Sequence, residues 1–244
     1  MQATNFWHKL ALYRHQIVLW ALLLLSPTVW GQSYKWARQH NPNYDERKIS
    51  YGFMIGIHTS AYQVKYSDKF VTQSFDTVHS VLAPFAPGFS LGFLVNLRLN
   101  ADLDLRAMPK AGFYDHQLEY NYTDESSQSQ LTETTMVEVP ILLKYKSMRR
   151  GNVRMYMVGG ITPSIEASGK NDIQSSTEVL DIRQTNLSLD AGFGFDFYFP
   201  LFKFSQEIRF SRGIANVLGP DPSKFKEPLR RVNTNTISVY FIFQ

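Results

Sequence analysis

The sequence has 244 residues, a formal net charge of +4 and a mean hydropathy of -0.23. This length fits one domain of ordinary size. Only one long apolar run exists, at the N-terminus, so the chain is not a bundle of membrane helices. The modest net charge does not indicate a nucleic-acid partner. Because the sequence has no Cys, it excludes a disulfide framework, a thiolate zinc site and a lipid-modified N-terminal Cys.

The N-terminal segment is typical of a secretory signal peptide. Lys9 and Arg14 precede an apolar stretch over residues 17–25, and Pro27 ends that stretch. We therefore predict a signal peptide over residues 1–31. The alternative, a retained single-pass membrane helix, is disfavoured because the apolar stretch is short for a full span.

The rest of the chain is predicted to consist of a polar, mobile leader over residues 32–48 and one β domain over residues 49–244. In this domain apolar and polar residues alternate with the period of two that is typical of strands with two different faces. The clearest case is residues 186–200, where Leu, Ala and Phe share one parity and mostly Ser, Asp and Gly share the other. The segments with this pattern are 51–62, 89–98, 102–120, 137–146, 153–166, 186–200, 204–214 and 236–243.

The links between these segments alternate in length, as in bacterial outer-membrane barrels with short periplasmic turns and long external loops. Short links are predicted near Asn100, at 148–152 and at 200–203, and long polar links at 65–86, 121–132, 167–184 and 215–233. The predicted fold is all-β: a transmembrane, antiparallel, up-and-down β-barrel of about eight strands with both termini in the periplasm. Pro109 and Pro140 interrupt two strands and are expected to mark bulges, because proline lacks the backbone N–H.

A soluble lipocalin-like barrel or a β-sandwich is the alternative to a membrane barrel. A water-facing polar surface usually carries many long charged side chains, whereas here the polar parity is rich in Gly and Ser, as expected for a narrow filled lumen. The run of Phe residues at 193–199 would also favour aggregation in water. The composition of both faces therefore favours a membrane barrel in the bacterial outer membrane.

If the apolar parity faces lipid, a nearly balanced set of charged residues points into the lumen. We expect these charges to pair and to close the barrel, the alternative being a proton or ion path, while an open general porin would need about 16 strands. The predicted lumen residues are Arg98, Asp104, Arg106, Glu138, Lys144, Lys146, Arg154, Asp190, Asp196, Glu207 and Arg209.

Each His is a candidate for catalysis, because small barrels can support hydrolysis through a His, a Ser and an acid. His58 and Ser60 share the inward parity, with Glu207 or Glu166 as a conceivable orienting acid, but a hydrogen-bonded lumen His is the favoured interpretation. His79 and His116 are predicted in or beside loops and His40 in the leader. We expect no enzyme activity, no catalytic, cofactor-binding or metal-binding residue, and no cofactor.

The last predicted loop, from Gly213 to Arg231, contains three Pro residues and an excess of Lys and Arg over acids. Docking of a partner or of lipopolysaccharide phosphates is one interpretation of this composition. A solvated loop is the favoured one.

Two runs carry a resemblance to a known family: PGFSLGFLVNLRLNADLDLRAMPKAGF at residues 87–113 and VEVPILLKYKSMRRGNVRMYMVGG at residues 137–160. They resemble PorT-like proteins, small outer-membrane barrels of the Bacteroidota whose namesake belongs to the type IX (Por) secretion system. The resemblance implies an accessory, non-enzymatic part in the export of proteases and adhesins that carry C-terminal sorting domains. The partners it implies are outer-membrane lipid and other type IX secretion components, such as translocon or periplasmic subunits, with no nucleic acid.

Overall fold

The computed structural model describes residues 40–67, 78–122, 127–167, 183–219 and 228–244. The predicted signal peptide and residues 32–39 of the predicted leader therefore lie outside the described residues. Among the described residues, no helix is long and apolar enough to span a membrane. The regular elements are η2 (Tyr44–Glu46), β1 (Ile49–Tyr66), β2 (Val78–Leu82), β3 (Ala86–Arg98), β4 (Leu103–Ala107), β5 (Lys110–Tyr122), β6 (Ser127–Glu138), β7 (Ile141–Lys146), β8 (Val153–Glu166), β9 (Thr185–Tyr198), β10 (Lys203–Gly213) and β11 (Leu229–Phe243).

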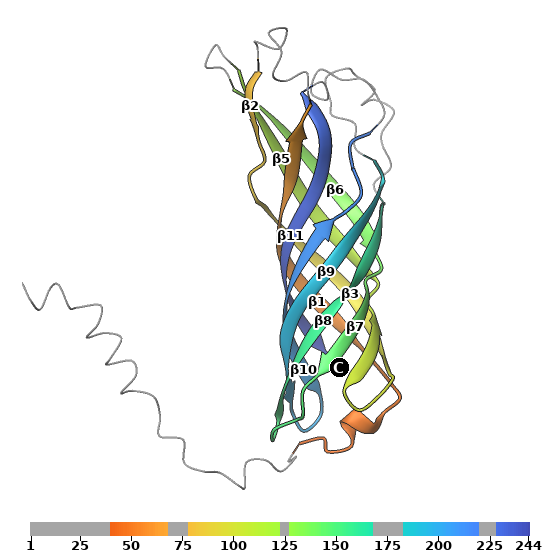
Figure 1. The fold of residues 1–244 in the computed structure, drawn as a ribbon. Coiled ribbons are helices and arrows are strands. Elements are labelled where there is room, and N and C mark those ends of the chain that lie inside the picture. Colours follow the sequence, from red (N-terminus) through yellow and green to blue (C-terminus); the bar gives the residue numbers. More distant parts are fainter. Residues whose placement is uncertain (1–39, 68–77, 123–126, 168–182, 220–227) are drawn as a thin grey trace, which may run out of the picture. The chain divides into compact units, whose positions relative to one another are not determined.

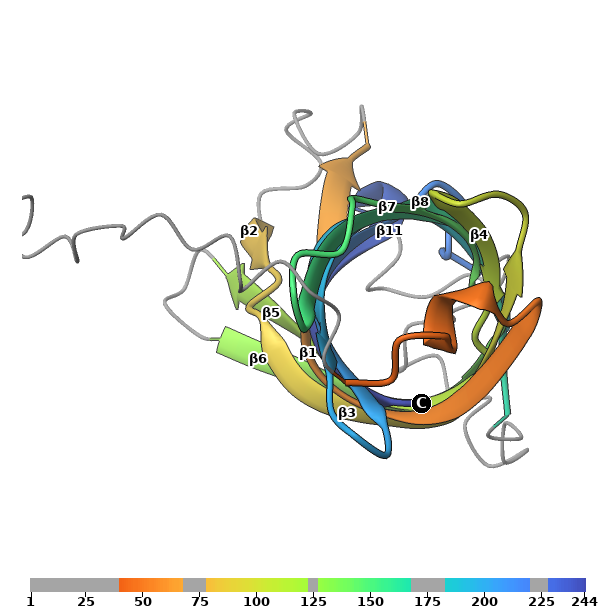
Figure 2. The ribbon, with the colours of Figure 1, turned by 90° about the horizontal axis from the view of Figure 1, so that it is seen from below.

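The strands form one antiparallel sheet whose pairings close into a ring (Figures 1 and 2). The order around the ring is β8, β7, β4, β3, β1, β11, β10 and β9, and β9 pairs again with β8 from Val153↔Phe197 to Ile165↔Thr185. The longest seam joins β1 to β11, from Phe53↔Phe243 to Tyr66↔Leu229. This ring confirms the predicted antiparallel β fold, and β2 is a short additional strand that pairs with β5.

Two of the ring strands are each divided by a proline, as predicted. Pro109 separates β4 from β5, and Pro140 separates β6 from β7. Proline cannot donate to the ladder, so pairing stops there. The carbonyl oxygens still accept bonds from the neighbouring strands: Phe93 N–H donates to Pro109 at 2.9 Å, and Met108 N–H donates to Pro140 at 3.0 Å. One long strand is thus made of β4 and β5, and another of β6 and β7. Beyond the breaks the wall continues, because β3 pairs with β5 and β6 pairs with β8.

The strand ends differ from the prediction at two of the long links. The predicted polar link at 121–132 is much shorter, because β5 and β6 form a hairpin paired from Lys110↔Glu138 to Asn121↔Ser127. The predicted link at 215–233 also gives way to strand, since β11 already begins at Leu229. Polar residues predominate over 121–130, and Leu229 and Val232 do not share one parity, so alternation of hydrophobicity could not reveal the backbone pairing in either place.

The two faces of the ring have opposite chemistry. Along β9, Leu189 and Phe193 are about half exposed on the outside, whereas Asp190 and Asp196 are buried inside. The same inversion runs around the ring: most large apolar side chains face outward, whereas many Lys, Arg, Asp and Glu side chains face inward, beside a buried apolar cluster that includes Met54, Leu94 and Leu142. A sheet with an apolar outer surface and a charged interior is the arrangement expected in lipid rather than in water.

The two ends of the ring are unlike each other. Short connections at residues 99–102, 147–152 and 199–202 lie at the end where the chain terminates at Gln244, and we call this the turn end. The opposite end, which we call the loop end, carries the paired ends of β5 and β6, the last residues of β8 and β10 and the first residues of β9 and β11. Residues 40–48 also lie at the turn end (Figure 2). The two ends of the described chain therefore share one side of the barrel, as predicted.

Candidate functional site

The interior of the ring is filled at mid-height by ion pairs, which we call the ion-pair belt. At its centre Glu207 of β10 accepts hydrogen bonds from Arg106 of β4 at 2.7 Å, from the Tyr156 hydroxyl of β8 at 2.9 Å and from Arg209. Arg106 also donates to Asn96 Oδ1 at 2.7 Å. The Arg106, Glu207 and Arg209 side chains are at most 1% exposed. One carboxylate therefore joins three strands across the lumen.

Further ion pairs complete the belt on either side of this centre. Lys144 contacts both oxygens of Asp196, at 2.9 and 2.7 Å, and Ser205 donates to Asp196 at 2.5 Å. Lys146 pairs with Asp104 at 2.6 Å, towards the turn end. These contacts connect strands far apart in sequence. Each charge has an opposite charge beside it, which is the condition under which buried ions are tolerated.

Towards the loop end the belt continues with Lys110, whose ammonium lies 2.5 Å from Glu138 and 2.9 Å from the Tyr240 hydroxyl. Tyr114 donates to the same carboxylate at 2.6 Å. Arg209 lies 3.7 Å from Asp190, which also accepts a bond from Thr162 at 2.6 Å. The predicted pairing of the lumen charges is thus observed, and side chains occupy the middle of the barrel.

Two inward glycines make room for the aromatic rings that separate these charges. A Cβ at Gly194 would lie 2.5 Å from the Tyr156 ring, and a Cβ at Gly56 would lie 2.6 Å from the Tyr240 ring. Lys144 lies 3.6 Å from the centre of the Tyr156 ring, in a cation–π geometry. The Gly-rich inward parity seen in the sequence therefore provides space for packed tyrosines rather than for an open channel.

Ten of the eleven predicted lumen charges are buried; the exception is Arg98, which is half-buried at the turn end and donates to the Asn100 carbonyl at 3.3 Å. Sequence reasoning missed Lys110 and Lys203, which are both 5% exposed. The signal was present, because Lys110 continues the parity of Arg106 across Pro109. Lys203 likewise shares the parity of Glu207 and stands two positions before the buried Ser205.

The part of the leader that the structure describes lies across the turn end. Figure 2 shows residues 40–48, in orange, crossing the opening of the ring. Asp45 accepts hydrogen bonds from the Tyr198 hydroxyl at 2.7 Å and from Arg154 at 3.1 Å, and Arg149 lies 3.8 Å away. The predicted leader thus contacts the barrel at these residues, through the salt bridges and hydrogen bonds of Asp45.

Tyr44 packs its ring against the barrel beside Asp45. Its ring is 6% exposed, packs edge-on against Tyr198 with centroids 6.0 Å apart, and lies 4.7 Å from the Lys203 ammonium. Burial raises the pKa of the Tyr44 hydroxyl to about 12, so the ring stays neutral at ordinary pH. Arg149 stacks 3.6 Å from the centre of the Tyr198 ring and donates to the Asn41 and His40 carbonyls. We call residues 40–47 the turn-end plug.

The candidate His and Ser residues meet in an arrangement that differs from the one expected from the sequence. Ser60 does not pair with His58; its hydroxyl lies 3.1 Å from Nε2 of His116 and 3.0 Å from the Thr236 hydroxyl. His116 is buried in β5 and stacks on Tyr62, so its predicted position in or beside a loop is wrong. His58 packs against the Tyr114 ring, with centroids 4.2 Å apart.

Glu207, one of the two acids named as possible partners of this group, is held elsewhere in the lumen. Glu207 is bonded in the ion-pair belt, and none of the hydrogen bonds of Ser60 or of the His116 ring described above involves Glu166. His40, in turn, belongs to the turn-end plug, where its backbone N–H donates to Asn152 Oδ1 at 3.0 Å. Among the described residues, no three His, Cys, Asp or Glu side chains gather closely enough to hold a metal ion.

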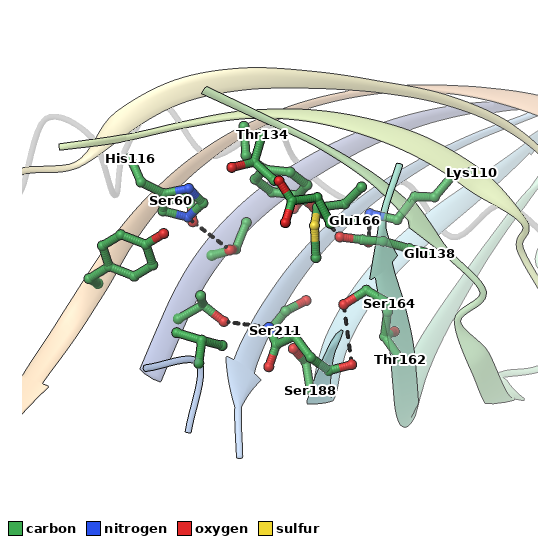
Figure 3. A pocket seen from close by; sticks show the side chains of 18 of the residues that line it. Ser60, Lys110, His116, Thr134, Glu138, Thr162, Ser164, Glu166, Ser188 and Ser211 are labelled. Atoms are coloured by element: carbon green, nitrogen blue, oxygen red, sulfur yellow. Dashed lines mark hydrogen bonds and ion pairs between the residues drawn. The ribbon is translucent and has the colours of Figure 1, made fainter. Parts of the chain in front are cut away.

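Ser60 and His116 form part of the wall of a cavity between the ion-pair belt and the loop end (Figure 3). The cavity has a volume of about 60 Å³, and the Lys110–Glu138 pair lies in its lining. Its wall comes from β1, β5, β6, β8, β9, β10 and β11, and nine of its twenty described lining residues are Ser or Thr. Towards the loop end a buried apolar cluster includes Tyr62, Leu118 and Val217.

The comparison with known protein families agrees with this architecture. The sequence profile of the family described as "Outer membrane protein beta-barrel domain" matches residues 30–219. A search of curated proteins gave no match.

Among solved structures, Neisserial surface protein A is 14% identical, with 80% of this chain and 98% of that chain covered and a TM-score of 0.43. The outer membrane protein OprG from Pseudomonas aeruginosa is 11% identical, with 81% and 95% covered and a TM-score of 0.47. The outer membrane protein AlkL is 12% identical, with 79% and 90% covered and a TM-score of 0.38.

Proposed function

We propose that this chain, which belongs to the outer membrane protein beta-barrel domain family, is a non-enzymatic accessory component of the type IX (Por) protein secretion system. The chain is a multi-pass β-barrel of the bacterial outer membrane. In the proposed role it assists the export of sorting-domain-bearing proteases and adhesins. It does so by docking to, assembling or stabilising a larger translocon.

The single observation that supports an accessory role is the filled lumen. Arg106, Glu207 and Arg209 meet across the middle of the ring with almost no exposed surface. An eight-stranded barrel has an interior just wide enough for side chains. A folded cargo protein cannot pass through it, so the cargo must cross the membrane elsewhere.

The connection to secretion rests on the resemblance over residues 87–113 and 137–160. These two runs include most of β3, all of β4 and β7 and parts of β5, β6 and β8. In the sheet β8, β7, β4 and β3 are consecutive neighbours. The segments that resemble the PorT-like family therefore form one continuous wall, and we propose that this wall or the loops at the loop end contact the other secretion components.

The non-enzymatic assignment is supported by the environment of Ser60. The Ser60 residue has no exposed surface, and Glu207, one of the acids considered as its orienting partner, is bonded in the ion-pair belt. A nucleophile of this kind needs an oriented base and access to substrate. His58, the residue first considered as the base, packs against Tyr114 instead.

The test is deletion of the gene in its native host, followed by fractionation to locate sorting-domain cargo. We expect cargo to accumulate inside the cell and to be exported again when the wild-type protein or the His58→Ala variant is supplied. Normal export in the deletion strain would overturn the proposal and favour the alternative, a stand-alone barrel acting as an adhesin, a narrow pore or a lipid-modifying enzyme. Loss of rescue by a correctly inserted His58→Ala protein would contradict the non-enzymatic role.

A second experiment tests the contact surface. A photo-crosslinking amino acid at Leu143 of β7 projects from the wall that carries the resemblance, whereas one at Ile208 of β10 projects from a strand elsewhere in the ring that lies outside this wall. The two side chains are 50% and 46% exposed, so the positions are matched. Crosslinks to secretion components from Leu143 alone identify this wall, and equal crosslinking from both positions would contradict its selection.

A further inference from the structure

Three cations stand together on the outer wall of the barrel at the loop end, and the ion-pair belt does not use them. Lys65 of β1, Arg231 of β11 and Arg212 of β10 come from three consecutive strands of the ring. Each has the outward parity of its strand, because it lies an even number of positions from an exposed apolar residue. These apolar residues are Ile57, Ile237 and Phe210. We call Lys65, Arg212 and Arg231 the outer basic cluster.

The register of the strands places two of these cations directly opposite each other. Lys65 is the cross-strand neighbour of Arg231 in the β1–β11 ladder. Like charges at directly opposite positions destabilise a sheet, so this pair works against the fold unless an anion lies beside it. Arg212 pairs with Asn235 and reaches across β11 to donate to Gln63 Oε1 of β1 at 3.2 Å. Positive charge is therefore gathered over β11.

This charge is not neutralised within the part of the chain that the structure describes. None of the three cations forms an ion pair with a described Asp or Glu. Arg231 donates to the Ile214 carbonyl at 2.6 Å, and Arg212 donates to Gln63. Because a guanidinium carries several N–H donors, these contacts leave donors of both side chains for a ligand.

The outward charges beyond β3 have the opposite sign. Asp115 of β5 and Glu133 of β6 are exposed, and they are also cross-strand neighbours. An anion is repelled by this acidic pair and attracted by the outer basic cluster. The charge around the loop end thus directs an anionic ligand to the wall made by β1, β11 and β10.

The height of the cluster on the wall matches the headgroups of the outer leaflet. In outer-membrane barrels the short turns face the periplasm and the long connections face the outside, so the loop end lies at the outer surface. Arg212 follows the exposed Phe210 by two positions on the same face of β10, at the edge of the apolar band. Long Lys and Arg side chains can lie along apolar surface and extend their charged ends to the headgroups.

From these observations we propose that the outer basic cluster binds the phosphate groups of a phosphorylated glycolipid of the outer leaflet, the headgroup chemistry that lipopolysaccharide presents. The guanidinium groups of Arg212 and Arg231 donate hydrogen bonds to the phosphate oxygens, and the Lys65 ammonium adds a third positive charge. The bound anion relieves the repulsion between Lys65 and Arg231. The acyl chains of the same lipid lie along the apolar wall below the cluster, so both parts of the lipid are held.

The test uses the mature protein in lauryldimethylamine oxide micelles with EDTA, so that divalent cations cannot bridge a phosphate to Asp115 and Glu133. The probes are bisphosphorylated lipid A, the same lipid after removal of its phosphates, and inorganic phosphate. Native mass spectrometry over a titration gives the number of bound lipids and their affinity. We expect bisphosphorylated lipid A to bind about tenfold or more tightly than either other probe, and less tightly as NaCl is raised.

Matched double variants locate the binding. Lys65→Gln with Arg212→Gln removes two cations of the cluster, whereas Lys48→Gln with Arg150→Gln makes the same change in charge at exposed residues of the turn end. We expect the first variant to bind bisphosphorylated lipid A about tenfold or more weakly, and the control to stay within about twofold of the wild type. Without lipid, the first variant should unfold at no lower a temperature than the wild type, because the like-charged pair is gone. Added lipid A should raise the unfolding temperature of the wild type more than that of the variant.

The contrary outcomes are distinct. Equal binding of lipid A with and without phosphates would show contact with the acyl chains only and would overturn the proposal. Equal losses in the two double variants would show a response to net charge and would overturn the site. Inorganic phosphate that binds as tightly as the lipid would overturn the assignment to a lipid headgroup, and binding that appears only when Ca²⁺ replaces EDTA would place the lipid at Asp115 and Glu133. Folding is checked for each variant by the shift in gel mobility between unheated and boiled samples.

Discussion

Replacing Asp196 with asparagine should strongly destabilise the barrel without changing the shape of the side chain. Asp196 has no exposed surface and faces Lys144, whose ammonium contacts both carboxylate oxygens. The Lys144 side chain is 1% exposed and lies over the Tyr156 ring. The substitution therefore leaves a buried ammonium group facing a neutral amide.

The magnitude follows from the burial of both partners. Removing one member of a buried ion pair leaves an uncompensated charge, which commonly costs about 3 to 5 kcal/mol. The introduced amide retains an oxygen that can accept from Ser205, so the loss of that hydrogen bond does not add fully to the cost. We expect the free energy of unfolding of Asp196→Asn to fall by about 3 kcal/mol or more.

The assay is reversible urea unfolding of the refolded barrel in detergent micelles, followed by far-ultraviolet circular dichroism. Asp102→Asn makes the same chemical change at an exposed residue of a short turn and should change stability by less than about 0.5 kcal/mol. The double variant Lys144→Met with Asp196→Asn removes both charges. It should be destabilised by clearly less than the sum of the two single variants, because neither partner is left as a lone charge.

Two results would refute this reasoning. A loss below about 1 kcal/mol for Asp196→Asn would show that the pair contributes no more than an exposed ion pair does. Strict additivity in the double variant would show that the two side chains do not interact energetically. Either result would mean that water or another group solvates the belt, and the filled-lumen argument for an accessory role would lose its support.

Two further predictions concern the turn-end plug and the strand packing. The protein has no native cysteine, so a single Tyr44→Cys residue can be labelled with a maleimide. It should react slowly, and about tenfold faster when Asp45→Asn removes the carboxylate that anchors the plug. Exposed Glu46→Cys serves as the control, and equal rates at position 44 with and without Asp45→Asn would contradict the anchoring. Gly160→Ala should impair folding, because its Cβ would lie 2.1 Å from the Ile141 carbonyl oxygen. Gly159→Ala should be tolerated, because the atom nearest to its Cβ is 3.8 Å away. Folded barrel is measured by the gel-mobility shift between unheated and boiled samples, and similar yields for both variants would refute this prediction.

Much of the architecture follows from the order of residues alone. Alternation along 186–200 separates outward Phe side chains from inward Asp196, because successive residues of a strand point to opposite faces. The same parity places Arg106, Lys144 and Glu207 inside the barrel. Pro109 and Pro140 predict the two breaks in strand pairing, since a residue without a backbone N–H cannot continue the hydrogen-bond ladder. These are local properties, and sequence spacing is sufficient to predict them.

The pairing of the inward side chains depends on the folded barrel. The sequence predicts that Glu207 must be paired, but the register between strands places Arg106, Arg209 and Tyr156 beside it. His58 and Ser60 are neighbours on one strand and yet do not interact, because Ser60 faces His116 of another strand, β5. Parity states which face a residue occupies and carries no information about the residue across the lumen.

The turn-end plug also depends on the folded barrel. Residues 40–47 show no alternation and read as a polar leader, and nothing local to them indicates that they are anchored. Asp45 becomes an anchor only because Arg154 and Tyr198, more than one hundred residues away in the chain, meet at the turn end of the closed ring. Residue order is thus enough to predict the strands and their two faces. The ion-pair belt, the cavity and the plug arise only when the ring closes, because each is made by side chains that only the curvature of the sheet brings together.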